Sequence, residues 1–434
     1  MAPAVVQQHK VDTDRFNPAA PAAEFVAQLR NPGDVFSVLL LLGGDIVARA
    51  IAQLVGPRGF TPVAFSFGWV TYALSAVTDA VSKNQLMPRA DYPCIVINGK
   101  SGYVRENDSF IIGRLMRDFE TWMDKQDVVG WEQRADFPDH TVRQCIDRIT
   151  DEKWQHLKAK AKGGEPEPKR PPYQPGLCVA IYDAETPDNN RPVLDAPYIA
   201  GVVAMVVQLG VAAIPLGIWG DWAILLITIS GIILSQALCL LPQWRREKWA
   251  SREETRKPKT IVLTKGNGAR HAIVIRDRGV GVDLEDLATA TVYVSLLTRV
   301  VVITLGVLWV VLLVIADSVG YHTWFLLAVG GIGMIQNIFA AGSPRSPAAL
   351  GIPLKFAGVI GAPKVMEALY KVEDFQPRLG LSMRDIFFPG KLTNDEVGAW
   401  NRYERQADEK SKMEKGVRSG NEDEIASGKP DHEK

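Results

Sequence analysis

Apolar stretches of membrane-spanning length alternate with long polar stretches along this chain. A transmembrane helix needs about 20 mostly apolar residues. Four stretches in the second half of the sequence meet this requirement with few or no charges, and two earlier stretches meet it with several polar residues inside. The pattern therefore predicts six spans, at residues 35–55, 60–81, 198–218, 221–241, 292–316 and 323–341.

The breaks between paired spans are very short, which predicts three helical hairpins. They lie at residues 56–59, at Gly220 and at residues 317–321, and together they hold one basic residue, Arg58. Lysine and arginine instead follow the second, fourth and sixth spans, as in the cytoplasmic loops of membrane proteins. We therefore expect an integral membrane protein with both termini and both large loops in the cytosol, in a membrane that the sequence does not identify.

The polar stretches carry signals for a small folded part. Runs of β-branched residues predict strands at residues 92–98 and 177–183, and apolar positions at helical spacing predict a helix at residues 109–125. Two more such runs flank Gly-Asn-Gly at residues 266–268, which favours a hairpin with a type I′ turn. The predicted fold class is an α-helical polytopic membrane protein with a small cytosolic α+β portion, built from the large loops and the C-terminal segment.

These patterns divide the chain into eight segments. The last of them is highly charged and almost free of aromatic residues, which predicts disorder. In order, the segments are a flexible N-terminal arm (1–33), a first transmembrane hairpin (34–82), a cytosolic loop domain (83–196), a second transmembrane hairpin (197–241), a cytosolic β-hairpin loop (242–290), a third transmembrane hairpin (291–341), a cytosolic C-terminal segment (342–400) and a disordered tail (401–434).

Charge and cysteine content argue against several classes of protein. Lys and Arg together number 49, as do Asp and Glu, so no global field points to nucleic acid as a partner. The four cysteines include no CxxC pair, and no two of the six histidines lie four residues apart. These spacings predict neither a disulfide framework nor a metal site. No motif indicates a cofactor.

The first candidate site lies inside the membrane. Asp45, Arg49 and Gln53 follow one another at intervals of four residues, so they share one face of the first span. Ionisable residues in a span usually face the bundle interior. Polar residues of later spans could line the same interior, namely Gln208, Arg299, Gln336 and Asn337. This group is either a polar cavity that binds a substrate headgroup or an ion, or a structural ion pair with interhelical hydrogen bonds.

The second candidate site is the predicted turn of the β-hairpin. Lys265, Arg270 and His271 flank its glycines, and a glycine-rich turn can hold an anion through backbone N–H groups and basic side chains. His271 is a candidate catalytic acid–base group and Arg270 a candidate catalytic residue that holds an anion. Lys265 is a candidate substrate-binding residue. The alternative is a solvent-exposed hairpin tip without chemistry.

A third candidate region directly follows the fourth span. Residues 242–257 combine Trp244 and Trp249 with several basic residues. Tryptophan is enriched at membrane interfaces, and basic clusters attract anionic lipids. The region therefore predicts contact with the lipid bilayer and its anionic headgroups, either as a general anchor or as a specific lipid site.

Six stretches distributed over the chain carry a resemblance. The stretches FTPVAFSFGWVTYA, PQWRREKWA, TKGNGARHAIVI, DLEDLA, WFLLAVGGIGMIQN and FFPGKL resemble a family of uncharacterised multi-pass membrane proteins of filamentous fungi. The resemblance covers the chain from about residue 34 to about residue 400. It implies a fungal origin and supports the arrangement of spans and loops, but it assigns no activity, cofactor or catalytic residue.

Three functions fit these features. The first is a non-catalytic scaffold or pathway component on the cytosolic face, which agrees with the lack of catalytic motifs. The second is a membrane-embedded enzyme that acts on a lipophilic small molecule, in fungal specialised metabolism or lipid metabolism. The third is a transporter or channel that uses Asp45 and Arg49, although six spans without a repeat are few for a secondary transporter.

Overall fold

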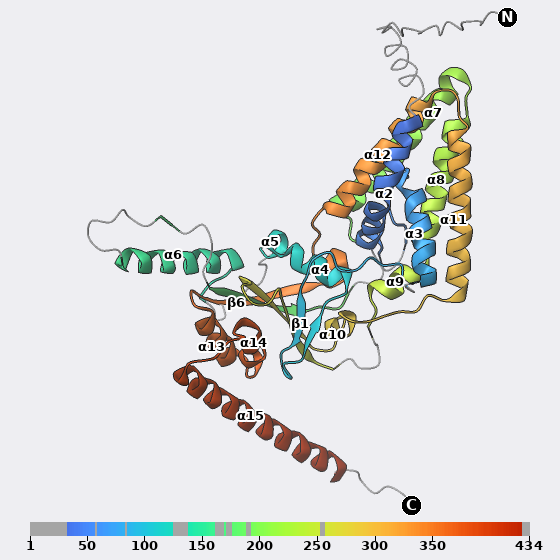
Figure 1. The fold of residues 1–434 in the computed structure, drawn as a ribbon. Coiled ribbons are helices and arrows are strands. Elements are labelled where there is room, and N and C mark those ends of the chain that lie inside the picture. The colour runs from blue at the N-terminus through green and yellow to red at the C-terminus, as the bar shows by residue number, and fades with distance from the viewer. Residues whose placement is uncertain are drawn as a thin grey trace, which may run out of the picture.

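The computed structural model describes residues 33–56, 59–82, 85–124, 138–160, 169–170, 176–187, 192–251 and 257–427, without side chains for residues 33–42 and 411–427. The predicted N-terminal arm lies outside these residues, except for Gly33. The described chain forms a bundle of apolar helices at one end and a six-stranded sheet with its own helices at the other (Figure 1).

Three helices in the described residues are long and apolar enough to cross a bilayer: α7 (Ala196–Trp219), α11 (Leu296–Asp317) and α12 (Thr323–Gly342). A fourth candidate is α8 (Ala223–Cys239) taken together with α9 (Pro242–Lys248), which is bent from it by 46°. These helices correspond to the last four predicted spans. The structure therefore contains three or four candidate spans and does not support six.

The predicted first hairpin is wrong in its second half. After α2 (Gly33–Leu54), residues 60–67 run without helix, and α3 (Gly68–Ser82) has only 15 residues, which is too short to cross a bilayer. Pro62 favours an extended conformation for the residue before it and cannot donate a backbone hydrogen bond. Residues 60–82 thus form a non-helical, mostly buried segment followed by a half-length helix.

This segment enters and leaves the bundle at the same end, so we call residues 60–82 the re-entrant segment. At its start, Gln53 at the end of α2 donates to the carbonyl of Ser343, directly after α12. At its end, the N–H groups of Leu86 and Met87 donate to Glu247 on α9. The break at residues 56–59 thus lies at the sheet end of the bundle. Accordingly, α2 begins at the opposite end (Figure 1), whereas the hairpin prediction placed its start at the sheet end.

Two close backbone contacts hold the re-entrant segment in the middle of the bundle. A Cβ on Gly68 would lie 2.6 Å from the Cα of Gly43 on α2. A Cβ on Gly333 of α12 would lie 1.7 Å from the carbonyl oxygen of Phe65. Only glycine allows the backbones to approach this closely. The sequence therefore uses glycine where the inserted chain meets its neighbouring helices.

The sheet has the order β2-β1-β4-β5-β3-β6. Its strands are β1 (Ile95–Asn98), β2 (Val104–Glu106), β3 (Leu177–Ala184), β4 (Lys259–Thr264), β5 (His271–Asp277) and β6 (Leu354–Ala362). Strands β3 and β5 are parallel, and all other neighbours are antiparallel. The sheet thus combines strands from both large loops and from the C-terminal segment. Its edge strand β6, which contains two glycines, had no clear sequence signal.

The turn between β4 and β5 differs from the predicted type I′ turn. The N–H of Ala269 donates to the carbonyl of Gly266, and Gly268 has a φ of 80°. Asn267 is not among the residues with positive φ, which a type I′ turn would require at both central positions. The connection is therefore a longer loop that contains a type II-like turn.

Helices cover both faces of the sheet. On one face lie α13 (Val365–Phe375), α14 (Leu379–Phe387) and the start of α15 (Asn394–Ser427), around a core that includes Val179 and Trp400. The other face carries α4 (Phe110–Arg117), α5 (Phe119–Trp122) and α6 (Val142–Lys160), and its buried residues belong to the same core as the membrane bundle. The sheet is therefore packed directly onto the bundle.

The expected disorder from residue 401 is not seen in the described part of the tail, because α15 continues to Ser427. A capping box begins this helix: Thr393 donates to Glu396, whose own N–H donates back to Thr393. The tail is also rich in Lys, Glu and Arg, which are good helix formers. Residues 428–434 lie outside the described chain.

Candidate functional site

The predicted intramembrane group does not converge on one cavity. Asp45 and Arg49 form an i,i+4 ion pair of 2.9 Å on α2, and their side chains are 68% and 42% exposed. Gln53 is buried one turn further on and donates to Ser343 at the sheet end of the bundle. Arg299 is in the first turn of α11, also at the sheet end. The roles proposed for these residues remain predictions.

The interior amides are bound to the re-entrant segment. Gln208 on α7 donates to the carbonyl oxygen of Phe65 at 2.6 Å, and Asn337 on α12 donates to Ser66 at 3.0 Å and to Ala64 at 3.3 Å. Gln336 accepts from the N–H of Ala64 and donates to the carbonyl of Pro62. Non-helical backbone at membrane depth requires such partners. These contacts match the structural interpretation of the polar interior.

Of the predicted hairpin residues, His271 begins β5, whereas Lys265 and Arg270 lie in the loop between β4 and β5. His271 at the start of β5 is 11% exposed, and its Nε2 lies 3.6 Å from Glu120 on α5. Burial lowers the pKa of His271, Glu120 raises it and Arg270 lowers it further, with a net decrease. The ammonium of Lys265 lies over the ring of Tyr92 at 5.2 Å. His271 is thus a packed residue beside one carboxylate, apart from the interior amides.

The two tryptophans of the third candidate region, Trp244 and Trp249, are partly or fully buried. Trp244 has no exposed surface and packs against Tyr72, with ring centroids 6.3 Å apart. Trp249 donates from its indole to the carbonyl of Leu350. Both rings therefore connect α9 to neighbouring segments, so the basic residues of α9 do not stand beside an exposed pair of tryptophans.

Sequence reasoning missed a group of basic side chains that we call the junction. It consists of Arg114, Arg117, Lys248 and Arg345, with the carboxylates of Asp91, Asp118 and Asp195. These residues come from separate stretches of the chain and meet where α2 and α12 end. The last carbonyls of a helix lack intrahelical partners and carry partial negative charge. Basic side chains can donate hydrogen bonds to these carbonyls and also balance their negative charge.

At the end of α2, two basic side chains donate to the terminal carbonyls. Lys248 donates to the carbonyl of Val55 at 2.5 Å and to that of Gln53 at 3.2 Å, and Arg345 also donates to Gln53. Arg345 in turn pairs with Asp195, the N-cap residue of α7. The junction therefore links the end of one bundle helix to the beginning of another.

At the end of α12, the cations come from α4. Arg114 donates to the carbonyl of Ala341 at 2.8 Å and pairs with Asp91 at 2.8 Å, while Arg117 donates to Gly342. Burial lowers the pKa of Arg114 to about 10, against the opposing charge of Asp91, so the guanidinium stays protonated at neutral pH. These bonds tie α4, and through it the sheet, to the membrane bundle.

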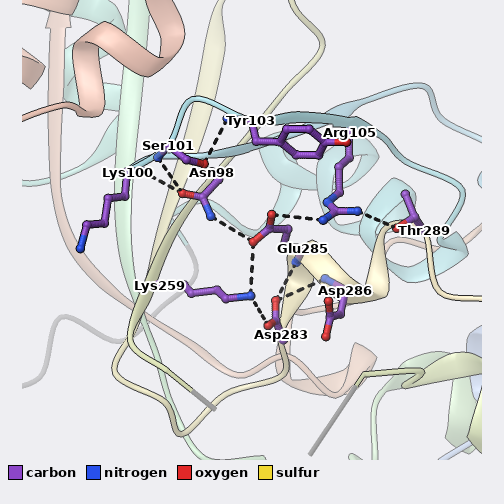
Figure 2. A network of polar contacts seen from close by, with 10 residues as sticks. All are labelled: Asn98, Lys100, Ser101, Tyr103, Arg105, Lys259, Asp283, Glu285, Asp286 and Thr289. Atoms are coloured by element: carbon purple, nitrogen blue, oxygen red, sulfur yellow. Dashed lines mark hydrogen bonds and ion pairs between the residues drawn. The ribbon is translucent and has the colours of Figure 1, made fainter. Parts of the chain in front are cut away.

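A second polar network holds α10 (Leu284–Leu287) against the β1–β2 end of the sheet (Figure 2). Glu285 accepts from Asn98 at 3.0 Å and pairs with Lys259 at 3.2 Å and with Arg105 at 3.4 Å. Burial would raise the pKa of Glu285, but the hydrogen bonds and charges of its partners lower it overall. Asp283, which also pairs with Lys259, caps the N-terminus of α10.

Asp283 and Glu285 thus lie at the start of a helix and pair with Lys259, while His271 has Glu120 as its neighbouring carboxylate. A small cavity lies beside this network, next to Thr289. No metal-binding group of three or more His, Cys, Asp or Glu side chains occurs among the described residues.

Comparisons with known proteins return no relative: no family model, no curated protein and no solved structure matches this chain. The resemblance to fungal membrane proteins is therefore untested.

Proposed function

We propose that this protein is a non-catalytic membrane scaffold that holds its sheet-containing part in a fixed orientation at the cytosolic face. The junction carries this proposal. Four basic side chains from three stretches of chain, all tied to the ends of α2 and α12, leave little freedom between bundle and sheet. Breaking such buried charge interactions typically costs about 3–5 kcal/mol each. A scaffold protein needs this rigidity to hold its partner-binding surface in one orientation.

The arrangement of the other polar groups agrees with this proposal. Asp45 and Arg49 form their ion pair on a partly exposed helix face. A transporter would instead need such residues to line an enclosed pathway for the solute. The buried amides are bound to the re-entrant segment. The face of the sheet that carries α13, α14 and α15 points away from the bundle, where a partner can reach it (Figure 1).

The test uses a strain that lacks the gene and is complemented by variants of the full chain. A twelve-residue Gly-Ser linker inserted between Gly342 and Ser343 lengthens the connection from α12 to Arg345 without removing a side chain. The same linker between Gly390 and Lys391, in an exposed loop, is the matched control. The proposal predicts that the first insertion abolishes complementation at normal protein level, while the second, and His271→Ala, do not.

A membrane-embedded enzyme is the second candidate, and the contact between His271 and Glu120 favours it. A carboxylate can orient a histidine for acid–base work. Under this alternative, His271→Ala abolishes complementation at normal protein level, and mass spectrometry of the strain's metabolites finds an accumulated lipophilic precursor. That outcome would overturn the scaffold proposal.

A further inference from the structure

A cavity of about 80 Å³ lies at the sheet end of the bundle, where α9, the start of α4 and the segment after α10 meet. Measured in this way, a cavity needs only about 10–15 Å³ to hold one water molecule. It therefore has room for a small polar group such as a phosphate. Among its lining residues are Arg89, Asp108, Ser109, Thr289 and Thr291.

Two of the charged residues in the cavity wall already have partners within the protein. Glu247 accepts from the N–H groups of Leu86 and Met87, and Lys248 donates to the end of α2. Arg89 and Asp108 differ, because both are exposed and the side chain of neither makes a hydrogen bond or ion pair with another residue that the structure describes. As far as the described residues show, the cavity thus offers one unpaired basic and one unpaired acidic side chain.

The position of the cavity points to the bilayer surface. Directly after Thr291, the chain leads into the membrane helix α11, and three large apolar side chains there are strongly exposed: Tyr293 (79%), Leu296 (77%) and Leu297 (74%). Tyrosine at the end of a span is typical of the headgroup level, and leucine belongs to the acyl region. A headgroup in the cavity would have its acyl chains beside these leucines.

We propose that this cavity binds the zwitterionic headgroup of a phosphatidylethanolamine-type lipid. The guanidinium of Arg89, with the hydroxyls of Ser109, Thr289 and Thr291, takes the phosphate, and the carboxylate of Asp108 accepts from the ammonium. A purely anionic headgroup leaves Asp108 facing like charge, and a quaternary ammonium has no N–H to donate. This proposal is independent of the scaffold function, because it involves neither the partner face nor His271.

The experiment is native mass spectrometry of the full chain in detergent, titrated with dihexanoyl-phosphatidylethanolamine. We expect one bound lipid per chain, with affinity about tenfold weaker in Arg89→Gln and in Asp108→Asn, since each loses a charge-assisted hydrogen bond. Arg246→Gln is the matched control, because Arg246 is an exposed arginine of α9 that does not line the cavity. It should bind like the original chain.

Three outcomes would overturn the proposal. One is unchanged affinity in both cavity variants. Another is equal binding of dihexanoyl-phosphatidylglycerol, which would identify a site for anionic lipid. The third is full competition by inorganic phosphate, which would identify free phosphate as the ligand. Thermal unfolding of each variant, measured in the same detergent, confirms that lost binding does not come from lost folding.

Discussion

The bundle interior and the junction solve the same physical problem with different side chains. Both must supply partners to backbone carbonyls that lack them. In the interior, the neutral amides of Gln208 and Asn337 donate to the carbonyls of Phe65 and Ala64 in the re-entrant segment. At the junction, where the bundle meets the sheet, cations such as Arg114 and Arg345 serve helix ends. A charge would be costly at membrane depth, whereas at the junction carboxylates stand close enough to compensate it.

The largest effect is expected at the junction. Arg345→Met leaves Asp195 without its ion-pair partner and removes a donor from the end of α2, so the free energy of unfolding should fall by about 3–5 kcal/mol. Unfolding in a denaturing detergent series measures it. Arg49→Met, which breaks the exposed pair with Asp45, is the control and should cost about 1 kcal/mol or less. An equal loss of unfolding free energy in Arg345→Met and Arg49→Met would contradict the claim that the junction stabilises the fold more than the exposed ion pair does.

The next effect concerns the backbone contact in the interior. Gly333→Ala places a Cβ where the carbonyl oxygen of Phe65 lies, and the strain should cost about 1–3 kcal/mol or more. Gly331→Ala is matched to it on the same helix, because nothing lies within 4 Å of its added Cβ. The control should be neutral or stabilising, since alanine favours helix over glycine. If Gly333→Ala is equally stable, the re-entrant segment does not pass there.

A smaller effect is expected for the amides. Gln208→Leu keeps the size of the side chain but leaves the carbonyl oxygen of Phe65 without that donor, at a cost of about 1–3 kcal/mol. Val206→Leu, on an exposed position of α7, is the control and should change stability little. The same unfolding series measures both. No loss in Gln208→Leu would show that the amide does not support the segment.

The smallest effect is a pH dependence on the sheet. Because burial lowers the pKa of His271 in the folded state, the unfolded state binds the proton more readily. The stability that neutral His271 contributes is present above its ordinary pKa of 6.5 and is lost as pH falls through its lower folded value. The melting temperature should therefore decline less between pH 7.5 and 5.5 in His271→Gln than in the original chain. An identical decline would contradict this.

The sequence predicts those parts of the fold that a local pattern encodes. Charge-free stretches identify the later bundle helices, and β-branched runs identify β1, β3, β4 and β5. The re-entrant segment could not be predicted in this way, because the hydrophobic pattern of an apolar stretch of span length does not show whether the stretch is one continuous helix. Pro62 is the one local signal against a continuous helix. The partners of the segment lie far away in the sequence: Gln208 and Phe65 are 143 residues apart, and Gln336 and Pro62 are 274 apart.

The junction could not be predicted for the same reason. Lys248 and Arg345 looked like the basic residues that commonly follow a span, and Arg114 belonged to an amphipathic helix. Their joint role depends on three distant stretches meeting at the ends of α2 and α12. Conversely, the spacing of Asp45, Arg49 and Gln53 correctly places them on one helix, but it does not show which neighbours that face meets.

The most direct test of a fixed bundle and sheet is a distance measured across the junction. Spin labels at Tyr321→Cys, at the exposed far end of the bundle, and at Lys371→Cys, exposed on α13, can be compared by pulsed electron paramagnetic resonance. The account predicts one narrow distance distribution, which broadens when the linker is inserted between Gly342 and Ser343. A broad distribution in the chain without the linker would contradict it.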